Sequence, residues 1–185
     1  MSNKYKFEDQ ESLYFITFSV VGWIDVFTRA VYKDILLDCF RHCIKEKGLA
    51  IHAYVIMSNH VHMIIGRKGE PSLSDIMRDL KKFSSFRILQ EIKQNPQESR
   101  KEWLLYLFAK AGKQNSNNKN YQFWQQDNHP IELHPTRNLF DQKLNYIHQN
   151  PVTAGLVNSA SAYVYSSASN YEFNEGVLQE VEVLY

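Results

Sequence analysis

The sequence predicts an α+β fold: a ferredoxin-like βαββαβ sandwich, in which an antiparallel sheet packs against helices. Three observations support this prediction. The chain has 185 residues, 44% of them hydrophobic and 14% aromatic, which suits one compact domain over 1–185 with a core at about 13–171. Strand-like and helical segments follow in the order strand, helix, strand, strand, helix, strand. A further C-terminal helix, which carries a tyrosine, comes after the final strand.

The first two elements are a strand and a helix. Residues 13–21, LYFITFSVV, are dense in aromatic and β-branched side chains, which predicts a buried strand. From 29 to 47 the apolar residues recur at helical spacing, and Gly48 stands where a helix is expected to stop.

The next apolar run, 49–65 (LAIHAYVIMSNHVHMII), is too long for one ordinary strand. We expect two strands, near 50–57 and 60–66, that turn at Ser58-Asn59. One long bent strand is the alternative.

A second helical stretch follows a polar turn. Ser72 is a plausible N-cap, with Asp75 three residues on. The helix is expected to run to about Gln94, and a shorter helical piece to cover about 99–111.

The last third of the chain begins with a polar, Asn-rich stretch at 112–120, which predicts a mobile loop that is either a plain connector or orders on DNA. A strand is expected at 121–126, YQFWQQ. A helix is expected at 136–149 and should end at Asn150-Pro151.

Composition narrows the class of protein. Lys+Arg number 21 and Asp+Glu 20, so a nucleic-acid-binding surface would have to gather its basic residues on one face. Cys39 and Cys43 lack further ligands at zinc spacing and are expected to be free thiols. No signal region and no membrane-spanning run are visible, which predicts a soluble, cytoplasmic protein without membrane contact.

Two histidines in the most strand-like run are candidate metal ligands. In a strand, His60 and His62 project from the same face, while Val61 points into the core. Two imidazoles side by side can hold one ion, and a third ligand must come from elsewhere in the chain. Two hydrogen-bonded surface histidines are the alternative interpretation.

The C-terminal helix carries a candidate nucleophile. On a helix, Tyr146 and Asn150 share a face because they lie four residues apart. A phenol beside a metal ion is a sensible nucleophile, and an Asn carboxamide oxygen suits Mg²⁺ or Mn²⁺. Asn150 is the expected third ligand, and His148 is the second candidate. A tyrosine that serves only in packing is the alternative.

Basic residues of the helix that follows the histidines are candidate DNA contacts. Arg78, Lys81 and Lys82 form a local stripe, and Arg87 lies further along the same helix. A solvated helix face is the alternative interpretation.

Taken together, these segments resemble a known family. YVIMSNHVHMII followed downstream by YIHQNPVTAGLV resembles the single-tyrosine HUH transposases, especially the REP-associated tyrosine transposases and the IS200-like transposases. YFITFSV, FWQQDNHPIEL and YVYSSASNY fit the same family. The resemblance covers about residues 13–171.

The resemblance implies a ferredoxin-like fold and a divalent metal, Mg²⁺ or Mn²⁺, held by His60, His62 and a side chain of the tyrosine helix. It implies that Tyr146 attacks a phosphate of single-stranded DNA. The products are a 5′-phosphotyrosine and a free 3′-OH, and strand transfer follows. Hairpin DNA is the expected partner, and a homodimer that exchanges the tyrosine helix is one of the assemblies found among relatives.

Two other functions fit the sequence. A ferredoxin-like sheet can bind nucleic acid without chemistry, as a domesticated or inactive relative would. A metal-dependent hydrolase, in which activated water attacks in place of Tyr146, would give nicked DNA without a covalent adduct.

Overall fold

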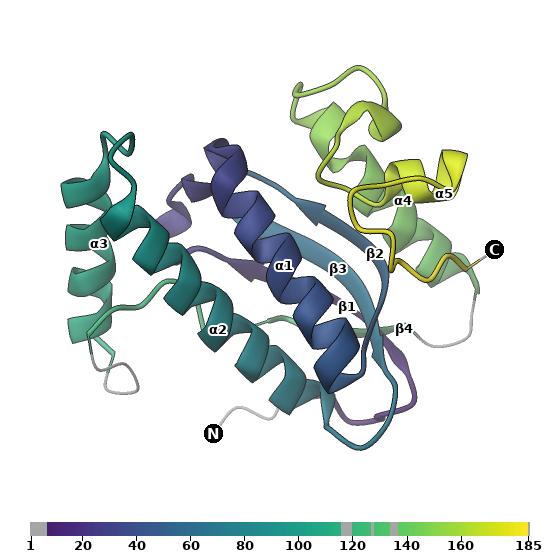
Figure 1. Cartoon of the computed structure of the whole chain (residues 1–185). Coiled ribbons are helices and arrows are strands. Elements are labelled where there is room, and N and C mark those ends of the chain that lie inside the picture. Colours follow the sequence, from purple (N-terminus) through teal and green to yellow (C-terminus); the bar gives the residue numbers. More distant parts are fainter. Residues whose placement is uncertain (1–6, 116–119, 127, 134–136, 185) are drawn as a thin grey trace.

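The computed structural model describes residues 7–115, 120–126, 128–133 and 137–184. Its sheet has four strands in the order β2-β3-β1-β4, and every neighbouring pair is antiparallel. Figure 1 shows α1 and α2 crossing one face of this sheet. The predicted ferredoxin-like order is confirmed, with α3 inserted between α2 and β4. The elements are β1 (Leu13–Ser19), α1 (Ala30–Lys47), β2 (Leu49–Ile56), β3 (His60–Arg67), α2 (Leu73–Gln94), α3 (Lys101–Lys113), β4 (Ile131–Leu133), α4 (Arg137–Thr153) and α5 (Ala168–Phe173).

The sheet has a core on each face. Along β3, Val61, Met63 and Ile65 are fully buried in the larger core, under α1 and α2. Ile64 points the other way, into a smaller core that includes Ile147 of α4. The alternation along the strand therefore gives the sheet one face covered by α1 and α2 and another covered by α4. His60 and His62 lie on the α4 face.

The two-strand interpretation of the long apolar run is confirmed. The turn between β2 and β3 is closed by the Met57 N–H, which donates to the carbonyl of His60 at 2.9 Å. The predicted N-cap is also present, since Ser72 Oγ accepts from the Asp75 N–H at 3.1 Å. Cys39 and Cys43 are buried free thiols.

The strand predicted at 121–126 is wrong. This segment pairs with the sheet only at the isolated bridge between Val20 and Trp124, and the fourth strand forms at Ile131–Leu133. Phe123 and Trp124 are neighbours in sequence, and both are buried, at 1% and 5% exposure. Two consecutive buried rings break the alternation that a regular strand requires, so the segment packs into the core as an irregular chain.

Two helix ends also differ from the prediction. α4 continues through Asn150-Pro151 to Thr153, and Gly155, with φ of 70°, follows as a left-handed terminator. Asn150 therefore stays helical and keeps its place one turn after Tyr146. α3 extends to Lys113, which removes two residues from the loop predicted at 112–120; residues 116–119 of that loop lie outside the described residues.

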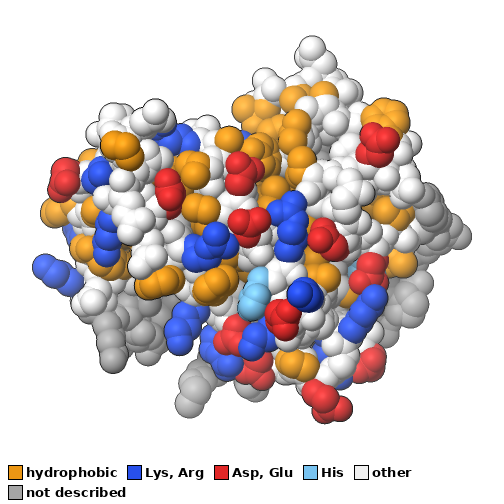
Figure 2. Space-filling view, viewed as in Figure 1, with side chains coloured by type: hydrophobic (Ala, Val, Ile, Leu, Met, Phe, Trp, Pro, Cys, Tyr) orange, Lys and Arg blue, Asp and Glu red, His pale blue; other side chains and the backbone are white. Residues whose placement is uncertain are grey.

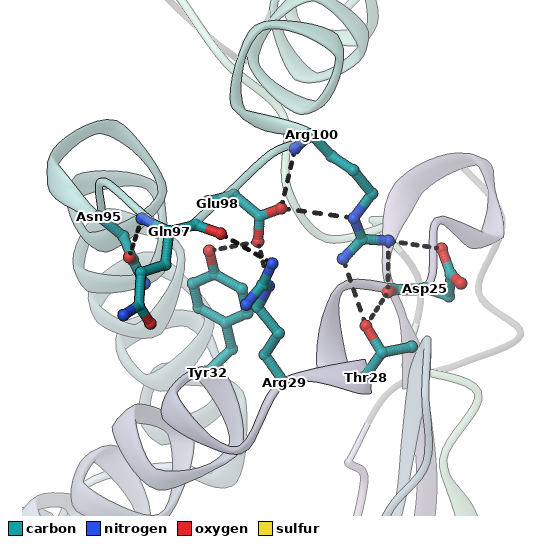
Figure 3. Close-up of polar contacts among 8 residues, drawn as sticks. All are labelled: Asp25, Thr28, Arg29, Tyr32, Asn95, Gln97, Glu98 and Arg100. Carbon is teal, nitrogen blue, oxygen red and sulfur yellow. Dashed lines mark hydrogen bonds and ion pairs between the residues drawn. The ribbon is translucent and has the colours of Figure 1, made fainter.

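A buried charge cluster ties the connection between α2 and α3 to the start of α1 (Figure 3). The Glu98 carboxylate is fully buried and accepts from the Tyr32 hydroxyl at 2.8 Å. Arg29 Nε pairs with it at 3.0 Å, and the backbone N–H of Arg100 donates to it at 3.0 Å. Arg100 also reaches Asp25, so α3 is held against the chain that precedes α1.

Across the described part of the chain, no helix combines the length and the apolar character needed to cross a bilayer.

Candidate metal and nucleophile site

The histidine pair lies on the α4 face of β3. The ring centroids of His60 and His62 are 4.7 Å apart, and the rings are nearly perpendicular. The register with β1 sets Ser19 opposite His60 and Thr17 opposite His62. The sequence prediction that the two imidazoles share a face is confirmed, and the anchored strand behind them fixes their separation.

Asn59 fixes which ring nitrogen of a neutral His60 carries the proton. Its amide Nδ2 donates to the carbonyl of Trp23 at 3.1 Å, and a carbonyl can only accept. Asn59 Oδ1 therefore faces His60 Nδ1, 2.7 Å away, and accepts from its N–H. In the neutral ring the lone pair is consequently on Nε2, which is the form that a metal ligand needs.

His62 is held by β1. Thr17 Oγ1 lies 2.7 Å from His62 Nδ1, and the Phe15 ring stacks on the imidazole at a centroid distance of 5.5 Å. Nδ1 is thus occupied by the hydroxyl, which leaves Nε2 directed toward α4. Both histidines present Nε2 as the atom available to a ligand.

Burial controls the charge of the pair. It lowers the pKa of His60, and it lowers the pKa of His62 to about 3, with the neighbouring His60 and Lys143 charges acting in the same direction. Both imidazoles are therefore neutral at pH 7, as metal coordination requires.

α4 brings Tyr146 to the histidines. Ile147 is fully buried and anchors the helix on the sheet, while the Tyr146 side chain is 46% exposed. The Tyr146 hydroxyl lies 3.4 Å from His62 Nε2, and its ring meets Phe15 edge-on at 5.9 Å. Lys143 Nζ lies 5.8 Å from the centroid of the Tyr146 ring. A half-exposed phenol beside a histidine nitrogen is accessible to a large substrate.

Asn150 and His148, the two candidates for the third ligand, lie on different sides of α4. Asn150 lines the same cavity as Tyr146, a hollow of about 530 Å³ along the helix. His148 Nε2 lies 2.9 Å from Ser167 Oγ, and its ring packs on Tyr171. Within the described ranges, no group of three or more His, Cys, Asp or Glu side chains that could hold a metal ion is present.

The four basic residues predicted to contact DNA do not form one surface. Arg87 pairs with Asp38 of α1 at 3.6 Å, whereas Arg78, Lys81 and Lys82 line a cavity of about 530 Å³ between α2 and the 121–128 segment. Arg78 also pairs with Asp79 at 3.3 Å. Figure 2 shows basic and acidic side chains interspersed on the α1–α2 face.

Lys81 connects this cavity with the histidine site. Its Nζ donates to the carbonyl of Gln125 at 2.6 Å and to Asn128 Oδ1 at 2.8 Å. The carbonyl of Asn128 in turn accepts from the backbone N–H of Thr17, the residue whose hydroxyl meets His62. Asn128 and β1 therefore link the cavity to the residue that contacts His62.

Sequence reasoning missed Thr17 and Asn59. Thr17 becomes a partner of His62 only through the β1–β3 register, which local pattern does not specify. The sequence predicts only a turn at Asn59, although an amide directly before a candidate ligand is a signal for a residue that orients that ligand.

Comparisons with known proteins show which family and which solved structures the chain is similar to. The family model described as "Transposase IS200 like" matches residues 14–126, a span that includes both histidines and ends before Tyr146. A solved REP-associated tyrosine transposase bound to a REP hairpin is similar over 100% of this chain and 99% of its own, with a TM-score of 0.67 and 17% identity. A candidate transposase from Deinococcus radiodurans R1 covers 80% of this chain and 98% of its own, with a TM-score of 0.43 and 18% identity. No curated protein matches the chain.

Proposed function

Because the chain belongs to the IS200-like transposase family, we propose that it cuts and rejoins single-stranded DNA through Tyr146. The family makes it a transposase, a DNA-processing enzyme. The proposal adds the chemistry: tyrosine attack assisted by a divalent metal, a 5′-phosphotyrosine intermediate, and strand transfer.

One observation carries the proposal: within a single chain, the Tyr146 hydroxyl lies 3.4 Å from His62 Nε2. The phenol is 46% exposed and lies beside two neutral imidazoles, so a DNA phosphate can reach it. The distance supports a tyrosine that serves its own histidine pair, so the proposed reaction needs no exchange of α4 between two copies.

The donor set fits a divalent ion. His60 and His62 each offer Nε2, and Asn150 offers a hard carboxamide oxygen from the helix that carries the nucleophile. When bound, Mg²⁺ or Mn²⁺ would polarise the scissile phosphate and stabilise the charge that develops on it. The protein supplies the arrangement, since Thr17 and Asn59 orient the two imidazoles.

In the proposed reaction the phenolic oxygen of Tyr146 forms a bond to phosphorus, and the bond from phosphorus to the 3′-oxygen breaks. The phenolic proton leaves to solvent, and the departing 3′-oxygen takes up a proton. A 3′-OH of another strand then attacks the phosphotyrosine in the reverse sense, which restores the phenol. The phosphodiester is exchanged for a phosphotyrosine bond and is not hydrolysed, so the cut end can still be joined to another strand.

Single-stranded DNA with hairpin structure is the proposed substrate. The similar solved transposase is bound to a REP hairpin, and Arg78, Lys81 and Lys82 line one cavity beside α2. These side chains are proposed to contact phosphates of the strand that leads to the site. Arg87, held by Asp38, would contribute from a different part of the surface. Binding through phosphates should weaken steeply as salt is raised.

The test is a covalent adduct between protein and a labelled single-stranded oligonucleotide, resolved by denaturing electrophoresis with Mn²⁺. The unaltered chain should form the adduct, and Tyr146→Phe should abolish it while DNA binding is kept. Tyr106→Phe is the matched control, because Tyr106 is 64% exposed on α3. An adduct that survives in Tyr146→Phe would refute the proposal. Nicked DNA without adduct would indicate attack by water, and binding without either product would indicate a nucleic-acid-binding module.

A further inference from the structure

An exposed tryptophan lies beside the histidine pair. Trp23 is 57% exposed, and its ring meets the edge of His60 at a centroid distance of 5.9 Å. The ring contacts make a row in the order Trp23, His60, His62, Tyr146. The two ends of this row, Trp23 and Tyr146, are the accessible rings.

The backbone of Trp23 is strained. Its φ is 54°, a left-handed conformation that is an outlier for a bulky residue, and it follows Gly22 at φ of 64°. The conformation is held by two hydrogen bonds. The Trp23 N–H donates to Val20 at 3.0 Å, and the Trp23 carbonyl accepts from Asn59 at 3.1 Å. The loop after β1 is thus fastened to the turn that presents His60.

Core packing does not account for this strain. Trp124 shows what a packing tryptophan looks like in this protein: it is 5% exposed, lies against Phe18 and Phe27, and its indole N–H donates to Ser84 at 3.0 Å. Trp23 leaves more than half of its surface in water. Backbone strain that holds an exposed aromatic ring next to polar catalytic groups is typical of a ligand-binding position.

We propose that Trp23 is the stacking platform for one unpaired nucleobase, that of a nucleotide adjoining the phosphate bound between the histidines and Tyr146. This rests on the proposed function. A DNA strand whose phosphate lies at the histidine pair carries planar aromatic bases within one nucleotide of that phosphate, and Trp23 offers an exposed aromatic ring at that range. Stacking of this kind tolerates any base, because every base has a π-face. It would hold the strand at the site whatever its sequence, and it would exclude duplex DNA, in which the base is already stacked.

The experiment measures binding in the Tyr146→Phe background, so that no covalent product interferes. The probes are a fluorescein-labelled (dT)12 and a 12-mer of abasic deoxyribose phosphates with the same label. Trp23→Ala should weaken (dT)12 binding about 10-fold, the typical effect of losing one stacked base, and leave the abasic probe unchanged. Trp23→Phe should retain most of the affinity. Trp103→Ala is the matched control, since Trp103 is 49% exposed on α3 and should affect neither probe.

Three outcomes would overturn the platform. Equal affinity of Trp23→Ala and its parent for (dT)12 is one. An equal loss on the abasic probe is the second, because it would indicate a structural role for the residue. The third is a change of oligomeric state in sedimentation without any base-dependent loss, which would make Trp23 a contact between copies. Adduct formation by the unaltered chain is measured separately. A missing adduct with the base-dependent effect intact would refute the proposed function and leave the platform standing.

Discussion

The two faces of the sheet use the same strands for different purposes. Toward α1 and α2, β3 presents Val61, Met63 and Ile65, all fully buried in the larger core. Toward α4, the same strand presents His60 and His62 above a smaller core. Close packing on one face fixes the backbone of the strand, and the same backbone holds the histidines on the other face in place. The difference indicates that the packing of one face of a strand can hold the functional groups on its other face in place.

Polar groups differ between the two faces in the same way. On the α1–α2 side, the buried Glu98 carboxylate is surrounded by a hydroxyl, a backbone N–H and two guanidinium groups (Figure 3). On the α4 side, the Nδ1 atoms of His60 and His62 contact Asn59 and Thr17. These contacts orient the rings and leave Nε2 for a ligand. A buried polar group whose bonding capacity is used up holds the fold together, whereas one with an atom left over can do chemistry.

The largest expected effect is on adduct formation, and it is tested by comparing His62 and Met63, neighbouring residues of β3 that face opposite sides of the sheet. His62→Ala should lower adduct formation about 1,000-fold, because losing several kcal/mol of metal-assisted stabilisation costs a factor of ten per 1.4 kcal/mol. Mn²⁺ binding by calorimetry should be lost as well. Because His62 is 5% exposed and stacks on Phe15, the unfolding midpoint should also fall, but less than in a variant of the larger core.

Met63→Ala, one residue along, should show the reverse: about 3 kcal/mol lost from the free energy of unfolding, and Mn²⁺ binding retained. Met63 is fully buried on the opposite face. If both variants lost stability and metal binding together, the separation of the two faces would be wrong.

The Glu98 cluster tests the structural side of the comparison. Glu98→Gln should lower the free energy of unfolding by about 2 kcal/mol at pH 7, because the charged acceptor of several hydrogen bonds is lost beside two partly exposed arginines. Burial alone would raise the pKa of Glu98, but the Arg100 N–H, the Tyr32 hydroxyl and the two arginines together hold that pKa below its usual value.

The sign of the pH dependence follows from that depressed pKa. The unfolded carboxyl binds a proton at higher pH than the folded one, so unfolding takes up a proton in acid. The stabilisation is therefore fully present above about pH 5, given an unfolded pKa near 4.3, and is lost as pH falls through the folded pKa. The gap between the unaltered chain and Glu98→Gln, measured by urea unfolding, should narrow below pH 5. Glu102→Gln, an exposed acid at the start of α3, should show no such gap.

The next prediction tests the orientation of the first histidine. Asn59→Ala should weaken Mn²⁺ binding about 30-fold, within the 10- to 100-fold range typical for a group that orients a ligand. Asn59→Asp should retain much of the affinity, since its carboxylate can still accept from His60 Nδ1. An alanine variant with unchanged affinity would show that the hydrogen bond to His60 has no orienting role.

The sequence predicted what depends on local spacing. The alternation of 60–66 gave the shared face of His60 and His62, and helical spacing gave the common side of Tyr146 and Asn150. What it could not supply depends on distant pairing: the register that sets Thr17 opposite His62, and the fourth strand at Ile131–Leu133 in place of 121–126. The position of Trp23 beside the site follows from a left-handed loop that residue pattern alone does not encode.

The smallest expected effect concerns the third ligand. Asn150→Ala should weaken Mn²⁺ binding about 10-fold, since one neutral oxygen ligand is lost while both imidazoles remain. His148→Gln should leave Mn²⁺ binding unchanged, because His148 is engaged with Ser167 on another side of α4. The two residues lie on one helix, two positions apart, so each is a control for the other against general disturbance of α4.

A loss of Mn²⁺ affinity in His148→Gln with none in Asn150→Ala would reverse the assignment, and it would require α4 to turn about its axis when metal binds. Equal losses of Mn²⁺ affinity in both variants would instead indicate that metal binding depends on the position of α4 and not on either side chain. The outcome would also decide how far the rigid face of the sheet controls the site, since His60 and His62 are fixed by β3 whereas the third ligand depends on how α4 is seated.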